Sequence, residues 1–317
     1  MKVSVCMITY NHEKYIAQAI ESVLMQETHF EYELVIGDDC STDKTREIVL
    51  TYKEKFPEKI QLLLPERNLG MMRNFVVTLT KCSGNYVALL EGDDYWIDTH
   101  KLQKQVDILE RQPDCVICAH NSQVINEGVS DYQLFNQHPI QTITDIRTLL
   151  TNSWYLPTAS ILFRNDKDLL TKLPLWFYKV KNGDLTLQLI LTDKGGKIWY
   201  MSDVMSVYRL HSTGVSQMFK DYSTWHLAVI YIYKKFNSYS RYRHAHLLNF
   251  KIAVSSLEVI KYQKKYSKKF WLAVKDYLYY KQPLSLKDLK ILVGDYIIPA
   301  SLMGFFQQLK KHSTKIL

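Results

Sequence analysis

The first 120 residues alternate between apolar segments and segments with helical periodicity, and this alternation most restricts the possible folds. The strand-like segments are short, apolar and rich in β-branched residues: 2–8, 32–36, 60–64, 86–90 and 115–119. The segments with apolar residues at helical spacing lie between them: 15–25, 43–56, 71–81 and 101–111. Strands follow one another at roughly 25 to 30 residues, the repeat of a β-α-β unit. The pattern predicts a parallel sheet covered by helices on both faces.

The rest of the chain is less regular. Residues 121–180 contain short apolar runs among polar loops, residues 185–191 have helical spacing, and residues 199–208 are typical of a strand. From about residue 218 the pattern becomes helical, with Lys and Arg interleaved with Tyr, Phe and Trp. No internal repeat is visible. An apolar fraction of 47% and an aromatic fraction of 13% exclude a disordered chain.

Charge divides the chain at the same place. The net charge is +8, but residues 1–217 carry −5 and residues 218–317 carry +13. We therefore expect a catalytic domain at 1–217 and a basic, aromatic-rich helical extension at 218–317. The basic part should favour an anionic partner.

The cysteines indicate a reducing compartment, and the apolar segments predict no membrane-spanning helix. Five cysteines in 317 residues form no disulfide framework. The start of the chain has no apolar signal segment, and the apolar stretch 291–306 contains Asp295. That stretch is shorter than the roughly 20 residues that cross a membrane. We expect a cytoplasmic protein, peripheral on the inner face of the cell membrane.

Polar residues follow four of the expected strands: Thr9-Tyr10-Asn11, Gly37-Asp38-Asp39, Asn68-Leu69-Gly70 with Arg73, and Glu91-Gly92-Asp93-Asp94. Ligands of parallel sheets bind beyond the carboxyl ends of the strands, where these residues would meet. Asp and Asn also favour turns, which accounts for any one of the four segments. It accounts poorly for acids at successive strand ends when the strands themselves are nearly free of charge.

Carboxylates gathered at one edge repel each other unless a cation lies between them. Oxygen ligands suit Mg²⁺ or Mn²⁺, which keeps coordination positions for substrate phosphates. Acids together with one arginine therefore suggest a nucleotide that carries a diphosphate. The sequence contains neither G-x-x-x-x-G-K-[ST] nor G-x-G-x-x-G, so a P-loop and a dinucleotide site are not supported.

Four segments, in this order and spacing, closely resemble the family 2 glycosyltransferases: residues 3–11, 33–43, 68–70 and 89–96. Further matching pieces are Gly183-Asp184 and the segment 208–211, Tyr-Arg-Leu-His. The resemblance implies a glycosyltransferase-A type fold, an α/β/α sandwich with a mostly parallel central sheet. It also implies a nucleotide-diphospho-sugar donor and a saccharide or lipid-linked acceptor.

The resemblance implies roles for individual residues. The nucleotide would be bound by Thr9, Tyr10, Asn11, Asp39 and Arg73. The family's metal motif is Asp-x-Asp, where this chain has Glu91-Gly92-Asp93. Asp93 would ligate a divalent cation, Mn²⁺ or Mg²⁺, directly. The role of Glu91 is open between reaching the metal through water and holding the sugar or ribose.

Further implied roles concern the donor sugar and the acceptor. Residues 94–96, which are Asp94, Tyr95 and Trp96, would contact one of them. Asp184 would be the general base that activates the acceptor hydroxyl, with inversion at the sugar. A helix N-cap is the alternative for Asp184. His211 would contact the metal or the diphosphate, with a surface loop histidine as the alternative.

The basic region allows three interpretations: nucleic-acid binding, a helical bundle solubilised by lysines, and attachment to an anionic membrane surface. We favour the membrane, since no nucleic-acid motif is present. For the whole chain we expect glycosyl transfer in bacterial surface polysaccharide synthesis. A nucleotidyltransferase is a rival, but its Gly-rich basic first loop is absent. A catalytically inactive nucleotide-sugar-binding scaffold or sensor is the alternative that Glu91 encourages.

Overall fold

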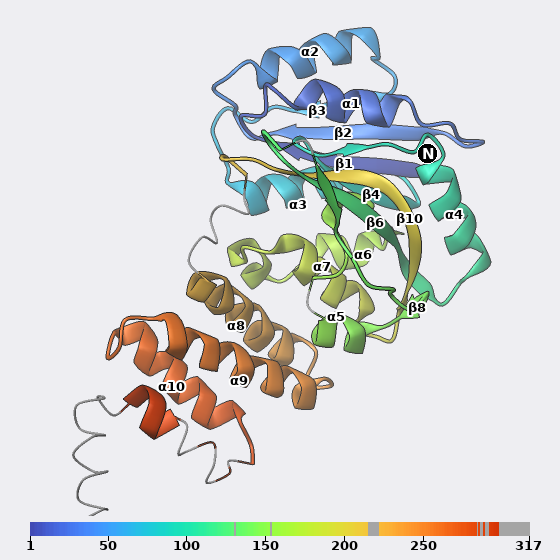
Figure 1. Ribbon diagram of the computed structural model, residues 1–317. Coiled ribbons are helices and arrows are strands. Elements are labelled where there is room, and N and C mark those ends of the chain that lie inside the picture. The colour runs from blue at the N-terminus through green and yellow to red at the C-terminus, as the bar shows by residue number, and fades with distance from the viewer. Residues whose placement is uncertain are drawn as a thin grey trace, which may run out of the picture. The chain divides into compact units, whose positions relative to one another are not determined.

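Strand β1 (Val3–Thr9) lies inside the sheet, between two parallel neighbours. It pairs with β2 (Tyr32–Asp38) on one side and with β4 (Tyr86–Glu91) on the other, and β3 (Ile60–Leu63) pairs with β2. The register sets Thr9 beside Asp38 and Ile8 beside Glu91. All four strands run in the same direction, so their carboxyl ends meet at one edge of the sheet (Figure 1).

The computed structural model in Figure 1 describes residues 1–129, 131–152, 154–214, 222–283, 285, 288 and 292–297. The chain divides into two compact units, Met1–Gln217 and Met218–Leu317. We describe each unit by itself.

Helices cover both faces of the first half of the sheet. Side chains of α1 (Ile16–Leu24), α2 (Thr45–Lys55) and α4 (Lys101–Arg111) join the core formed by Val3, Val5 and Met7 of β1. Helix α3 (Met71–Lys81) packs on β1 and β2 from the other side, as Figure 1 shows. Because helices cover both faces of the sheet, side chains on both sides of each strand are buried, and the strands are continuous apolar runs in the sequence.

The second half of the sheet is mixed. The strand order is β3-β2-β1-β4-β9-β6-β10-β5, in which β9 (Leu162–Arg164) lies antiparallel between β4 and β6 (Cys115–Asn126). The long strand β10 (Lys197–Leu210) runs parallel to β6. Three further strands pair antiparallel at the edges: β5 (Tyr95–Trp96), β7 (Tyr132–Leu134) and β8 (Ile143–Thr144). The predicted α/β fold with a mostly parallel sheet is confirmed.

Some expected element boundaries were wrong. The strand expected at 115–119 continues to Asn126, so His120 and Asn121 lie inside it and are buried. The helix expected at 185–191 is α7 (Gly183–Thr192), which places Asp184 in its first turn. Pairing with β10 along its whole length extends β6, and a single sequence does not show that pairing.

Short helices fill the remainder of the first unit: α5 (Ile146–Asn152), α6 (Lys167–Thr171) and the 3₁₀ turns η1 (Thr158–Ser160) and η2 (Leu175–Lys179). The side chain of Asp166 caps α6 by accepting a hydrogen bond from the backbone of Leu169. These elements connect β6 to α7.

The second unit is helical, as the basic pattern indicated. It contains α8 (Tyr222–Tyr239), α9 (Ala245–Tyr262), α10 (Lys268–Tyr280) and the π-helical turn η4 (Leu292–Ile297). Ser267 caps α10 by accepting a hydrogen bond from the backbone of Phe270. Among the described residues, no helix has the length and apolar character needed to cross a bilayer. Most of the apolar stretch 291–306 lies outside the described residues, and so do Lys310 and Lys311.

Candidate active site

The carboxyl ends of β1, β2 and β4 bring the expected polar segments together. The backbone N–H of Asp39 donates to the carbonyl of Thr9 over 3.0 Å, and that of Gly92 donates to the carbonyl of Ile8 over 2.9 Å. A Cβ atom on Gly92 would lie 2.6 Å from Oγ1 of Thr9 and 3.1 Å from Nδ1 of His12. The chain therefore needs a glycine where the loop after β4 passes the end of β1.

Three acids cluster in that loop. Glu91, Asp93 and Asp94 each offer a carboxylate oxygen, and these oxygens lie within 4.8 Å of one another. The Asp94 residue is 1% exposed; its Oδ1 accepts a hydrogen bond from the backbone N–H of Arg209 over 2.8 Å. Its buried Oδ2 has no hydrogen-bond partner among the residues that the structure describes.

Burial and the charges of their neighbours give these three acids different pKa values. Burial, with the charges of Asp93 and Asp184 adding to it, raises the pKa of Glu91 to about 8. Burial and the charges of Asp93 and Glu91 raise the pKa of Asp94 well above its usual value. Burial opposes the ionisation of Asp93 too, but His211 and His12 outweigh it and lower its pKa. Asp93 therefore carries the negative charge of the cluster.

Two histidines face Asp93. Nε2 of His211 lies 2.9 Å from Oδ2 of Asp93, while its Nδ1 lies 2.9 Å from Oγ1 of Thr213. Nε2 of His12 lies 3.7 Å from the same Asp93 oxygen. Burial lowers the pKa of His12, with the charge of Asp93 opposing that shift. The structure thus places the predicted His211 at the acid cluster and not on an exposed loop.

Sequence reasoning missed His12 and the part played by Arg209. The Arg209 guanidinium donates to the carbonyl of Asp93 and to Oε1 of Gln18, each over 2.6 Å. Its central carbon lies 4.8 Å from the ring centroids of both Tyr15 and Tyr95. The signals were present, since His12 directly follows Asn11 at the end of β1 and Arg209 stands in the segment 208–211.

Asp184 shares the electrostatic environment of the cluster, because its charge acts on Glu91. Its Oδ2 accepts hydrogen bonds from Nε1 of Trp154 over 3.0 Å and from Oγ1 of Thr158 over 3.3 Å. Burial raises the pKa of Asp184, and its hydrogen bonds oppose the shift. The capping alternative is wrong, since the N-cap of α7 is Asn182.

The residues expected at the nucleotide line the ends of β1 and β2. The Asp39 carboxylate accepts hydrogen bonds from the backbone N–H groups of Leu69 and Gly70, over 2.6 and 3.0 Å. Asn11, with φ at 57°, accepts a hydrogen bond from the backbone of Thr42 over 2.8 Å.

The other expected nucleotide residues differ in their exposure. The Tyr10 residue is 44% exposed, and Arg73 is exposed in the first turn of α3. The Thr9 hydroxyl is buried and has no hydrogen-bond partner. The loops therefore hold Asp39 and Asn11 in place, while Tyr10 and Arg73 have side chains free to meet a ligand.

The structure does not bring Trp96 to the ligand side of the sheet. The residue is 1% exposed, its Nε1 donates to the carbonyl of Ala159 over 2.8 Å, and Nζ of Lys101 lies 4.0 Å from its ring. Its neighbour Tyr95 stays partly exposed and stacks on Arg209. Trp96 was expected to contact a donor or acceptor, and this prediction is wrong because the side chain packs in the core.

The acid cluster fits a divalent cation. The unpartnered buried Oδ2 of Asp94 and the raised pKa of Glu91 indicate oxygens that lack a positive partner. Hard cations take carboxylate oxygens as ligands. The residues that could hold the cation are Glu91, Asp93 and Asp94, with His211 beside them.

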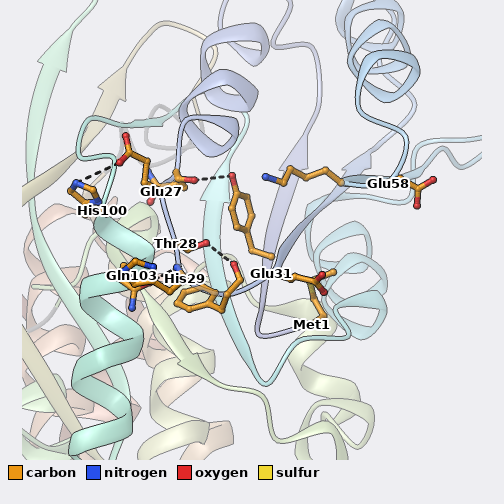
Figure 2. Close-up of a pocket in the computed structure, with 12 residues that line it drawn as sticks. Met1, Glu27, Thr28, His29, Glu31, Glu58, His100 and Gln103 are labelled. Atoms are coloured by element: carbon orange, nitrogen blue, oxygen red, sulfur yellow. Dashed lines mark hydrogen bonds and ion pairs between the residues drawn. The ribbon is translucent and has the colours of Figure 1, made fainter.

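A separate pocket lies at the opposite end of the first strands (Figure 2). Met1, Glu27, Glu58 and His100 line it, near the amino ends of β1 and β2. None of the predicted site residues lines it. Its position excludes it from the chemistry at the carboxyl ends.

Comparisons with known proteins show which proteins the chain is similar to. The model of the family described as Glycosyl transferase family 2 matches residues 4–169. "Uncharacterized protein Rv1520" of Mycobacterium tuberculosis is 33% identical over 217 residues, which are 67% of this chain and 60% of that protein. "Putative teichuronic acid biosynthesis glycosyltransferase TuaG" of Bacillus subtilis is 29% identical, over 68% of this chain and 81% of that protein.

Solved structures share the fold. TarS of Staphylococcus aureus, residues 1–349 in complex with UDP-GlcNAc, superimposes with a TM-score of 0.66 at 20% identity. The match covers 88% of this chain and 81% of that one. The mannosyltransferase PcManGT from Pyrobaculum calidifontis, in complex with GDP-Man and Mn²⁺, gives a TM-score of 0.56 at 15% identity, over 93% and 79% of the two chains.

Proposed function

Because the chain belongs to glycosyltransferase family 2, we propose that it transfers a sugar from a nucleotide-diphospho-sugar to a saccharide or lipid-linked acceptor in bacterial cell-surface polysaccharide synthesis. The reaction belongs to residues 1–217, and residues 218–317 form the basic extension. One observation carries the proposal: Glu91, Asp93 and Asp94 bring their carboxylate oxygens within 4.8 Å of one another at the carboxyl end of β4. Asp184 of α7 belongs to the same environment, because its charge helps to raise the pKa of Glu91.

The donor is a nucleoside diphosphate sugar. TarS binds UDP-GlcNAc and PcManGT binds GDP-Man, and both share the fold of this chain. In this proposal Thr9, Tyr10, Asn11 and Asp39 surround the nucleotide. Arg73 supplies a positive charge to the base or to a phosphate.

A divalent cation, Mn²⁺ or Mg²⁺, is held by Asp93 together with Glu91 and His211. The cation's chemistry is to neutralise the charge on the departing diphosphate. Asp93 is the ionised member of the cluster, since His211 and His12 lower its pKa. Tyr95 and Asp94 complete the wall of the site, and the backbone of Arg209 holds Asp94.

Asp184 is the general base. It takes the proton of the acceptor hydroxyl as the oxygen attacks the anomeric carbon, and the bond from that carbon to the diphosphate oxygen breaks with its electron pair. Direct attack from the opposite face inverts the configuration. Burial, which raises the pKa of Asp184, brings it closer to the range in which a carboxylate accepts a proton efficiently.

The second unit attaches the protein to an anionic membrane surface, on the cytoplasmic face. One side of α10 exposes Trp271, Leu272 and Tyr279, with exposed fractions of 46%, 51% and 70%. Lys268, Lys269 and Lys275 of α10 are exposed as well.

The charge of α10 fits an anionic partner. Its single acid, Asp276, lies 2.6 Å from Nζ of Lys234 and is buried. Aromatic residues and lysines together suit the interface of an anionic bilayer. Such a surface would present a lipid-linked acceptor to the enzyme.

Hydrolysis of the donor tests the proposal without knowledge of the acceptor. A panel of UDP- and GDP-sugars is incubated with the wild type in Mn²⁺, and nucleotide release is measured. We expect release from at least one donor, reduced by about 10²-fold or more in Asp184→Asn. Asp114→Ala, an exposed acid paired with Lys197, should keep the wild-type rate.

One outcome contradicts the enzyme assignment, and another contradicts only the assignment of Asp184 as the base. If donors raise the melting temperature but none is hydrolysed, the chain is the inactive scaffold or sensor. If Asp184→Asn hydrolyses the donor as fast as the wild type, the general base is elsewhere.

A further inference from the structure

An indole N–H is aimed at the carboxylate that we assign as the base. Nε1 of Trp154 donates to Oδ2 of Asp184 over 3.0 Å, and Thr158 donates to the same oxygen over 3.3 Å. Trp154 precedes η1 in the chain, while Asp184 stands in the first turn of α7, so the contact links two separate segments. No side chain among the described residues donates to Oδ1 of Asp184.

The backbone of Trp154 is in an unusual conformation. Its φ is 62°, in the left-handed region that bulky side chains rarely adopt. Such conformations cost energy and persist only where the surroundings enforce them, often at functional sites. The side chain is partly exposed, so core burial alone does not account for the strain.

We propose that Trp154 is a positioning residue for Asp184: its indole N–H holds Oδ2 and so presents Oδ1 to the acceptor hydroxyl. This inference rests on the proposed function, in which Asp184 is the base. A carboxylate with one oxygen held by two side-chain donors loses rotational freedom, and its other oxygen then points in one direction. Thr158 acts on the same oxygen as the second donor.

The N–H group also affects the charge of the base. Burial raises the pKa of Asp184, and a backbone hydrogen bond from Leu185 together with the side-chain bonds from Trp154 and Thr158 opposes that shift. The titratable group that Asp184 acts on is Glu91, whose pKa the charge of Asp184 helps to raise. Removal of the indole N–H should therefore move the ionisation of Asp184 to higher pH.

The experiment replaces the indole by a ring that cannot donate. Trp154→Phe, Thr158→Val and Asp184→Asn are compared with the wild type in donor hydrolysis, with the UDP- or GDP-sugar that the wild type hydrolyses fastest. We expect Trp154→Phe to lower kcat about tenfold with little change in KM, and to shift the acidic limb of the pH profile upward. Thr158→Val should shift the limb in the same direction by less.

A matched control separates this effect from a general loss of an indole. Trp225→Phe makes the same substitution in α8 of the other unit and should leave kcat and the pH profile unchanged. Thermal unfolding of each variant checks that it folds. If Trp154→Phe proves unstable, Thr158→Val carries the test through its pH profile.

The outcomes distinguish the two levels of the proposal. If no donor is hydrolysed, the proposed function fails and this inference fails with it. If Asp184→Asn retains wild-type hydrolysis, the assignment of Asp184 as the base fails, and this inference fails with that assignment. If Asp184→Asn is inactive but folded Trp154→Phe and Thr158→Val both keep the wild-type rate and pH profile, only the positioning role is overturned. In the double variant Trp154→Phe/Asp184→Asn, further loss beyond Asp184→Asn also contradicts it.

Discussion

One carboxylate oxygen, Oδ2 of Asp93, has two histidines facing it. His211 lies 2.9 Å away and His12 lies 3.7 Å away, and both lower the pKa of Asp93 in spite of its burial. The adjacent acids have raised pKa values, so one negative charge is favoured over three. At the scale of single residues, the site is an acid cluster in which neighbouring side chains select the ionised member.

The glycine between these acids is a test of how closely the loop is packed. In Gly92→Ala the new Cβ would meet Oγ1 of Thr9 at 2.6 Å, so the loop must shift. We expect a loss of stability of about 1–3 kcal/mol and a loss of Mn²⁺ binding, measured by thermal unfolding and by titration.

The control for this prediction is Gly196→Ala. Its Cβ would crowd Val116 at a similar distance, 2.6 Å, near the amino end of β10. It should lower stability comparably and leave Mn²⁺ binding intact. Equal Mn²⁺ affinity in Gly92→Ala and the wild type would show that the loop is not the cation site.

A buried lysine gives the protein a pH dependence of its own. Lys101 is fully buried beside Trp96, and burial lowers its pKa to about 7. Below pH 7 both states are protonated and the cost of burying the charge is fully present. Between about pH 7 and 10.5 the unfolded chain binds a proton that the folded chain lacks, so Lys101 makes stability rise with pH.

Lys101→Met removes this dependence. Unfolding is measured by denaturant between about pH 6 and pH 9.5, and the wild type should gain stability relative to Lys101→Met as pH rises. The difference in absolute stability between the two proteins does not isolate the effect of the charge, because Gln105 also loses the donor to its Oε1 in the variant. Parallel pH curves for the two proteins would mean that Lys101 stays charged when folded.

At the scale of elements, β10 holds the loop that follows β4. Its end carries Arg209, whose guanidinium binds the carbonyl of Asp93 between the rings of Tyr15 and Tyr95. His211 follows the strand directly and contacts the Asp93 carboxylate. Antiparallel pairing of β10 with β5 fixes the residues just beyond the acids. Helix α7, which precedes β10 in the chain, carries Asp184 in its first turn.

A lysine cannot replace this arginine. Arg209→Lys keeps the charge but loses the planar group that stacks between two rings and binds two acceptors. We expect kcat/KM for donor hydrolysis to fall about tenfold or more, since the Asp93 loop loses its orientation. The measurement compares hydrolysis and Mn²⁺ affinity with those of the wild type.

Arg164→Lys is the matched control. Arg164 binds the carbonyls of Cys115 and Leu109, and Tyr86 pairs with it at the amino end of β4. Its loss should lower stability without changing Mn²⁺ affinity. If both variants change Mn²⁺ affinity equally, the effect is one of general destabilisation and not of loop orientation.

The elements that could be predicted from sequence are those with local signals. Periodicity predicted β1 to β4 and their helices, and the carboxyl ends of parallel strands then placed Asp39 and Asp93 at one edge. The antiparallel strand β9 and the long extension of β6 depend on pairing between distant segments, which no local pattern shows. The same reason hid Trp154, whose role comes from a partner 30 residues away.

Predictions made from residue type alone also put some residues in the wrong place. Trp96 follows the acids in sequence and was expected at the ligand, but β5 turns its ring into the core. His120 lies just beyond the strand expected at 115–119 and is fully buried in β6. Which face of a short strand is buried depends on what packs over it, and that information is not local.

At the scale of the whole molecule, the two units differ in charge and in architecture. The mixed α/β unit is acidic overall, and the helical unit has a net charge of +13 over residues 218–317. The division in charge was visible in the sequence because it depends only on composition. The basic second unit is the part for which we propose an anionic partner.

Vesicle sedimentation tests this role. The protein should sediment with vesicles that contain anionic lipid at low salt and be released at high salt, because screening weakens the attraction. Lys268→Glu/Lys269→Glu in α10 should reduce sedimentation about tenfold. Lys167→Glu/Lys172→Glu, exposed in the first unit, should not. Equal binding of anionic and neutral vesicles, or none to either, contradicts the membrane proposal.

In the proposed reaction, the acids at the carboxyl ends of the strands hold a cation, which binds the donor's diphosphate. Its most direct test is calorimetric titration of UDP and GDP into the protein with and without Mn²⁺. We expect Mn²⁺ to tighten the binding of one nucleotide at least tenfold, and Asp93→Ala to abolish that gain while the protein stays folded. Nucleotide affinity that is the same with and without Mn²⁺, or the same in Asp93→Ala as in the wild type, would contradict the account.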